Sequence, residues 1–238
     1  MSERFFTASP PQDGRAFLAG DEARHLAKVL RAREGDEIVL FDGRGREWPA
    51  RVVRIGRDTV DLDAGTAAVD APPTGLPLTL AVALPKGDRQ KWMVEKLTEL
   101  GVARLVPLET TRGVAEATEG ARARLERGVI EACKQCGRNT LMEIAAGQTI
   151  EQMLSGNTED IHRVIAHPGG RSLDAAMPAT VRSVIALVGP EGGFTDDELA
   201  AAERAGASSV SLGPHILRVE TAAIALAARL VAAAPARA

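Results

Sequence analysis

A glycine-rich turn between an expected strand and an expected helix is the first stretch that could do chemistry. The apolar run 184–188 leads into GPEGG at 189–193, and a helix is predicted to begin at Thr195. Turns of this kind hold ligands with backbone amides at a helix N-terminus. The Walker lysine and the G-x-G-x-x-G dinucleotide pattern are both absent. Because Glu191 inside the turn would repel a phosphate, we expect a neutral or cationic ligand.

Three more acids follow the turn, and the helix itself explains them. Thr195 with Glu198 fits a capping box, and acids in a first turn are favoured by the helix dipole. We therefore expect Asp196, Asp197 and Glu198 to stabilise the helix N-terminus. Glu191 precedes the helix, so it stays a candidate ligand contact.

The two cysteines, Cys133 and Cys136, have a C-x-x-C spacing that occurs in redox pairs and in zinc sites. No second cysteine pair exists, and the four histidines are scattered. Helical spacing puts both cysteines on one apolar stripe with Leu125 and Val129. We expect buried, reduced thiols and no metal site.

A second candidate site is a stripe of cations near the N-terminus. A helix is predicted over about 21–31, with Leu26, Val29 and Leu30 on its apolar face. Three cations share another face at helical spacing: Arg24, Lys28 and Arg31. Such a stripe is either a solvated face or a contact for an anionic partner. The net charge of −3 excludes a general polyanion binder, so nucleic acid would need a local patch of this kind.

The chain of 238 residues divides in pattern at the proline-rich stretch 71–77. Residues 1–72 show short strands and turns around one helix, which favours a small β-barrel domain. Residues 73–238 alternate strands and helices, which favours an α/β domain with a largely parallel sheet. Aromatic residues are 3% of the chain, which argues against an RNA module that stacks several bases. With no apolar run of 18 residues, we expect a soluble cytoplasmic protein and no membrane contact.

Three loops follow strands of the predicted parallel sheet and should meet at its carboxyl edge. They are HPGG at 167–170, GPEGG at 189–193 and GPHILR at 213–218. Arg218 and Glu220 stand at the mouth of the final helix. An arginine there either pairs with a carboxylate for structural reasons or meets a ligand.

The motifs KGDRQKWMVEKLTELGV, CKQCGRN, LVGPEGGFTDDEL and LGPHILRVETAAIAL occur in the order found in the RsmE-type methyltransferases. The chain resembles that family over nearly its whole length, and RHLAKVLRAREGDEIVLFDGRG resembles the family's PUA-like RNA-binding domain. The family belongs to the SPOUT superfamily and methylates N3 of a uridine in 16S ribosomal RNA. This chain departs from the family pattern at His215, where arginine is usual, and in KQCGR at 134–138, where EQSGR is usual.

The resemblance implies S-adenosylmethionine as cofactor, a trefoil knot in the α/β domain, a homodimer, and 16S ribosomal RNA within the small subunit as partner. It implies a cofactor pocket formed by His167, Gly189, Glu191, Gly192, Leu212, Gly213, His215, Ile216, Leu217 and Thr221. It implies RNA contacts by Arg24, Lys28, Arg31, Lys86, Arg89 and Arg138.

The implied reaction also suggests catalytic residues. Uracil N3 becomes nucleophilic when its proton leaves, and the resulting charge spreads onto O2 and O4. A fixed guanidinium at one carbonyl would stabilise that anion, and Arg218 is the candidate. Glu220 or a water is the candidate proton acceptor, and no metal is needed. A non-catalytic RNA-binding or assembly factor on the same scaffold is the alternative.

Overall fold

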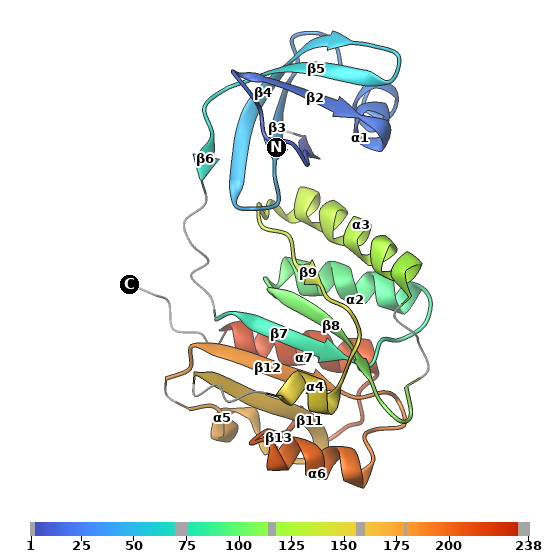
Figure 1. The fold of residues 1–238 in the computed structure, drawn as a ribbon, viewed down its shortest axis with the longest axis vertical. Coiled ribbons are helices and arrows are strands. Elements are labelled where there is room, and N and C mark those ends of the chain that lie inside the picture. Colours follow the sequence, from blue (N-terminus) through green and yellow to red (C-terminus); the bar gives the residue numbers. More distant parts are fainter. Residues whose placement is uncertain (1–2, 70–75, 114–117, 156–159, 179, 233–238) are drawn as a thin grey trace. The chain divides into compact units, whose positions relative to one another are not determined.

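The computed structural model describes residues 3–69, 76–113, 118–155, 160–178 and 180–232. The chain forms two compact units, which are described here one at a time (Figure 1). The N-terminal unit comprises Met1–Pro73 with Ile130–Leu141, and the C-terminal unit comprises Thr74–Val129 with Met142–Ala238. Most of the expected linker at 71–77 lies outside the described residues, and the domain boundary between 72 and 73 stays a prediction.

A six-stranded sheet forms most of the N-terminal unit, in the order β1-β3-β4-β5-β2 with β6 paired to β4. Strand β1 runs parallel to β3, and the other neighbours are antiparallel. The elements are β1 (Arg4–Phe6), β2 (Arg15–Ala19), α1 (Gly20–Arg24), η1 (His25–Val29), β3 (Glu37–Phe41), β4 (Arg46–Ile55), β5 (Thr59–Ala64) and β6 (Ala68–Val69). Strand β5 buries every second residue, as a sheet with one face on a core requires. The expected short strands around one helical segment are confirmed.

The helical segment itself differs from the prediction of one α-helix over 21–31. Helix α1 ends at Arg24, and η1 is a π-helical turn in which the Leu30 N–H donates to the His25 carbonyl at 3.0 Å. The wider turn keeps Leu26 in the core but leaves Val29 68% exposed. The predicted apolar face is therefore wrong at Val29 and at Leu30, which is also exposed.

The same change removes the single α-helix on which the predicted basic stripe was based. Arg24, Lys28 and Arg31 are all exposed, but only Arg24 lies in the α-helix. Arg31 lies beyond the helical turn in a left-handed conformation with φ of 53°. The spacing argument for the stripe assumed 3.6 residues per turn, which the π-helical turn does not keep.

The C-terminal unit is built on a seven-stranded sheet in the order β10-β8-β7-β12-β11-β13, with β9 paired to β8. Every strand pair in it is parallel, as predicted. Its strands are β7 (Leu78–Val82), β8 (Arg104–Glu109), β9 (Glu143–Ile144), β10 (Gln148–Thr149), β11 (Ile161–Ser172), β12 (Ser183–Val188) and β13 (Ser208–Ser211). Its helices are α2 (Asp88–Glu99), α4 (Ile150–Leu154), α5 (Leu173–Ala176), α6 (Asp196–Arg204) and α7 (Val219–Ala232). Helix α3 (Glu119–Cys136) belongs to this unit up to Val129 and to the N-terminal unit from Ile130 onward.

Helices cover both faces of this sheet. Helix α7 packs on β7, β12 and α2, while α4 packs on α6 (Figure 1). The strands between them are apolar on both sides, as in the fully buried run Leu80, Ala81 and Val82. Continuous apolar strands of this kind are typical of parallel sheets covered on both faces.

The predicted apolar stripe along α3 holds for all but its last member. Leu125, Val129 and Cys133 are buried, but Cys136 is exposed at the end of the helix. The expectation of two buried thiols is therefore wrong for Cys136, since the helix ends there and Gly137 turns the chain away. Burial raises the pKa of the Cys133 thiol to about 11.

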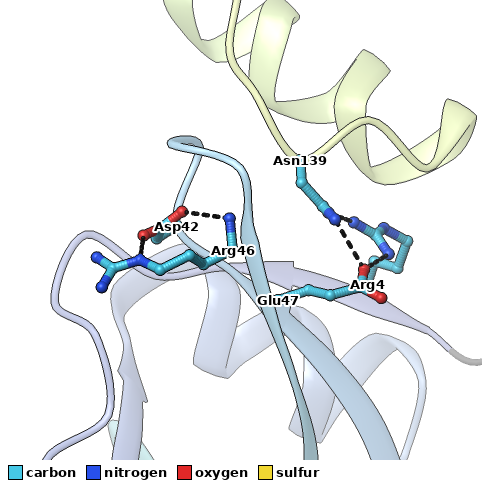
Figure 2. Close-up of polar contacts among 5 residues, drawn as sticks. All are labelled: Arg4, Asp42, Arg46, Glu47 and Asn139. Atoms are coloured by element: carbon cyan, nitrogen blue, oxygen red, sulfur yellow. Dashed lines mark hydrogen bonds and ion pairs between the residues drawn. The ribbon is translucent and has the colours of Figure 1, made fainter. Parts of the chain in front are cut away.

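Asn139, just after α3, joins the sheet of the N-terminal unit (Figure 2). Its side chain is buried, accepts a hydrogen bond from Arg4 and donates to Glu47 at 3.0 Å. Arg4 also donates to Glu47 at 2.8 Å. These hydrogen bonds, that from Arg4 first, hold the pKa of the Glu47 carboxyl below its usual range. The backbone takes part too, since the Gly45 N–H donates to the Asn139 carbonyl at 3.0 Å.

Asp42 orders the neighbouring β3–β4 turn from within (Figure 2). Its buried carboxylate accepts the backbone N–H groups of Arg44 at 2.8 Å and Arg46 at 3.2 Å. The Arg46 side chain donates to the same carboxylate at 2.7 Å and lies over the Trp48 ring. The turn is therefore fixed by one acid, and Arg44 at its tip is exposed.

Glu198 at the start of α6 joins two loops of the C-terminal unit. The predicted capping box is confirmed, with Thr195 accepting the Glu198 N–H and Glu198 accepting the Thr195 N–H at 2.7 Å. The carboxylate also accepts the Thr111 N–H at 2.8 Å. Burial raises the pKa of Glu198, but these hydrogen bonds outweigh it and the net pKa lies below the usual value.

We predict that Asn139→Ala lowers the free energy of unfolding by about 1–3 kcal/mol, because Arg4 and Glu47 each lose a partner. Gln135→Ala, at an exposed position on α3, is the matched control and should be nearly neutral. Urea unfolding followed by tryptophan fluorescence, to which Trp48 and Trp92 both contribute, measures both variants. Equal unfolding midpoints for the two variants would contradict the role given to Asn139.

We predict that Glu198→Gln destabilises the protein by about 1–2 kcal/mol at pH 7. A carboxyl whose folded pKa is lowered stabilises the fold above its unfolded pKa, and this contribution is lost as the pH falls through the folded pKa. The difference from wild type should therefore shrink in urea titrations repeated below pH 4. Asp196→Asn, at an exposed site in the same turn, should show a smaller and flatter effect. A difference that does not change with pH would rule out this explanation.

Candidate functional site

A cavity of about 350 Å³ lies in the C-terminal unit, beside residues 166–168 within β11 and at the carboxyl ends of β12 and β13. This volume is in the range of small-molecule sites. The three expected segments do meet there, contributing 167–168, 189–193 and 213–217 with the exception of Pro214. The full lining is Ala166, His167, Pro168, Val188, Gly189, Pro190, Glu191, Gly192, Gly193, Phe194, Ser211, Leu212, Gly213, His215, Ile216, Leu217, Val219 and Ala222.

The segment HPGG at 167–170 was expected to be a loop, and the structure corrects this. Strand β11 continues through this segment and pairs with β13 both before and after it. Ala166 and Arg171 are therefore both in register with Val210. The residues between them form a bulge, which turns His167 and Pro168 toward the cavity. A Cβ on Gly170 would lie 2.5 Å from the Val210 nitrogen, so only glycine allows this approach.

The GPEGG turn is held from outside the cavity by an arginine that sequence reasoning missed. The Arg112 guanidinium donates to the Gly192 carbonyl at 2.7 Å. A Cβ on Gly192 would meet the Arg112 side chain at 3.3 Å, so this glycine makes room for a neighbour of the turn. Arg112 lies 80 residues from Gly192 in the chain, and no local pattern could have linked the two.

The cavity is lined with one acid and with no lysine or arginine among the described residues. Of the residues predicted to bind a cofactor, only Thr221, which is exposed on α7, is not in the lining. Val219 and Ala222 line the cavity instead, and their i, i+3 spacing on the final helix is a signal that could have found them. A chemically consistent occupant is an apolar or cationic small molecule.

The two predicted catalytic residues do not line the cavity. Arg218 is exposed and stands between Leu217 and Val219, which both do. In the described part of the chain no carboxylate lies within ion-pair distance of Arg218, so the structure gives no support to a structural ion pair there. Glu220 is buried, and its nearest cation is Arg89 at 3.8 Å.

The cations predicted to contact RNA lie in different surroundings. Lys86 is exposed, while Arg138 is half-buried, and burial lowers the pKa of its guanidinium. Arg89 makes an ion pair with Glu191 at 3.2 Å. In the described ranges, no cluster of three or more His, Cys, Asp and Glu side chains could hold a metal ion, and no helix could cross a membrane.

Comparison with known proteins agrees with this architecture. Residues 72–231 match the RNA methyltransferase domain, and residues 18–64 match the RNA methyltransferase PUA domain. The ribosomal RNA small subunit methyltransferase E of Synechocystis is 33% identical over 86% of this chain and 69% of its own length. That of Mycobacterium tuberculosis is 33% identical over 92% of this chain and 87% of its own length.

A solved structure extends the match to three dimensions. The ribosomal RNA small subunit methyltransferase E of Neisseria gonorrhoeae, bound to S-adenosyl methionine, superposes with a TM-score of 0.87 at 30% identity and 96% coverage of both chains. The N-terminal unit is thus a PUA-like curled sheet, and the C-terminal unit is a parallel α/β fold of SPOUT type. The chain belongs to the ribosomal RNA small subunit methyltransferase E family of RNA methyltransferases.

Proposed function

We propose that this protein methylates N3 of a uridine in small-subunit (16S) ribosomal RNA with S-adenosylmethionine as methyl donor. The observation that carries the proposal is the charge of the cavity, which is lined with Glu191 as its acid and with no described lysine or arginine. S-adenosylmethionine carries a sulfonium and an ammonium and no phosphate, so it suits this lining better than a nucleotide does. The relative from Neisseria gonorrhoeae, which binds this molecule, supports the assignment.

The residues of the cavity fit such a ligand in polarity as well as in charge. The turn 189–193 and the segment 212–217 bring backbone groups close to the cavity, where they could hold an adenine ring. Ile216 lines the cavity with 86% of its surface exposed. Covering this apolar side chain with a ligand would be favourable. When bound, S-adenosylmethionine supplies an electrophilic methyl group.

Arg218 is the residue we assign to the uracil anion. It is exposed beside the cavity and has no ion-pair partner among the described carboxylates, so its guanidinium is available to a substrate. A preorganised cation at a uracil carbonyl would stabilise the charge that develops when N3 loses its proton. The same contact would orient N3 toward the methyl group.

The remaining assignments follow from the family and are proposals as well. The exposed cations Arg24, Lys28, Arg31 and Lys86 would contact RNA phosphates, which bind such groups without reading sequence. We propose a homodimer, a trefoil knot in the C-terminal unit, and action in the cytoplasm on ribosomal RNA within the small subunit.

We predict that calorimetry detects binding of S-adenosylmethionine but neither ATP nor NAD. Ile216→Ala should weaken S-adenosylmethionine binding roughly threefold to thirtyfold, because it removes apolar surface from the cavity. Val29→Ala shortens another exposed apolar side chain, in the N-terminal unit, and should leave this affinity unchanged. Clear ATP binding without a signal for S-adenosylmethionine would sink the proposal. Cofactor binding without methylation of small subunits or of free 16S RNA would favour a non-catalytic factor.

We predict that Arg218→Ala lowers the single-turnover methylation rate roughly 10²–10³-fold, the usual effect of losing one preorganised donor. The affinity for S-adenosylmethionine should stay within a few-fold of wild type. Arg218→Lys keeps the charge but loses the planar fork, so it should recover part of the rate. Arg204→Ala, an exposed arginine on α6, is the control and should keep the full rate. A normal rate for Arg218→Ala at saturating cofactor and RNA would remove Arg218 from the chemistry.

A further inference from the structure

Arg89 stands at the second position of α2 and touches two acids from distant parts of the C-terminal unit. Its guanidinium lies 3.2 Å from the Glu191 carboxylate in the GPEGG turn and 3.8 Å from the Glu220 carboxylate in α7. A single cation thus joins α2, the cavity turn and the final helix.

Glu220 is the member of this group that most needs a partner. Its side chain is only 7% exposed, and its Oε2 atom has no hydrogen bond within the described part of the chain. A buried carboxylate is costly unless a cation or hydrogen-bond donors compensate it. The nearby Arg89 guanidinium supplies that compensation, so Arg89 is not a free surface cation.

Glu191 is the member that faces the cavity. Its side chain is about half-exposed, so an ion pair with Arg89 alone would add little stability. The contact matters because Arg89 is itself fixed by the buried charge of Glu220. The next residue of the turn, Gly192, is held through its carbonyl by Arg112. Two arginines from separate segments therefore fix successive residues of the turn.

We propose that Arg89 is a positioning residue of the cavity, which compensates Glu220 and fixes the Glu191 carboxylate beside the ligand. This role replaces the RNA contact expected for Arg89, and it makes Glu220 a buried counter-charge rather than a proton acceptor. The identity of the ligand rests on the proposed function, but the Arg89–Glu220 contact does not.

The test compares Arg89→Ala with Lys86→Ala, an exposed cation three residues earlier that has no ion-pair partner among the described residues. Arg89→Ala should lower the melting temperature by on the order of 5 °C and weaken S-adenosylmethionine binding about tenfold. Lys86→Ala should change neither. Arg89→Lys keeps a cation near Glu220 and should melt within a few degrees of wild type, even if Arg89→Ala does not fold.

A rescue experiment separates compensation of Glu220 from other effects. Adding Glu220→Gln to Arg89→Ala removes the uncompensated buried charge and should recover most of the lost melting temperature. Adding Glu191→Gln, whose site is half-exposed, should not. Failure of the Glu220→Gln rescue overturns the proposal, as does an Arg89→Ala variant that loses only RNA affinity, to the same extent as Lys86→Ala. The melting temperatures are measured without ligand. A wild-type protein that does not bind S-adenosylmethionine would therefore contradict the proposed function but not the role of Arg89 beside Glu220.

Discussion

The close approach of two backbones at Gly170 is the constraint on which the cavity depends. Strand β11 pairs with β13 before and after its bulge, and a Cβ at Gly170 would lie 2.5 Å from the Val210 nitrogen. If a side chain at position 170 prevented this approach, the bulge could not form, and His167 and Pro168 would no longer line the cavity. The parallel sheet then determines the rest of the site, since the loops that follow β12 and β13 lie at the same edge as the bulge of β11.

The acidic and the basic side chains around the cavity occupy different positions. The acid Glu191 lines the cavity, whereas Arg89 and Arg112 hold the same turn without lining it. A cationic ligand would therefore meet the Glu191 carboxylate, whereas the two arginines hold the turn. Arg218 is different, because no described carboxylate engages it and its two chain neighbours line the cavity.

Much of the fold was predictable because it follows from local patterns of apolar and polar residues. The alternation in TVDLDA at 59–64, the apolar run at β7 and the Thr195–Glu198 capping box all behave as their residue types require. The cavity lining was predictable for a related reason, since loops after parallel strands must share an edge. The prediction failed where geometry departed from a regular period, at the π-helical turn that exposes Val29 and at the bulge of β11.

The sequence by itself determined most of the strand and helix types, the order of the two regions and the family, because these depend on residue period and on motifs. Only the tertiary structure decided what each charged side chain does. Arg89 and Lys86 look alike in the chain, yet Arg89 lies against a buried Glu220 from α7 and Lys86 is exposed. The reason is physical: the state of an ionic side chain depends on burial and on partners brought together from distant segments, and neither is encoded in its local spacing.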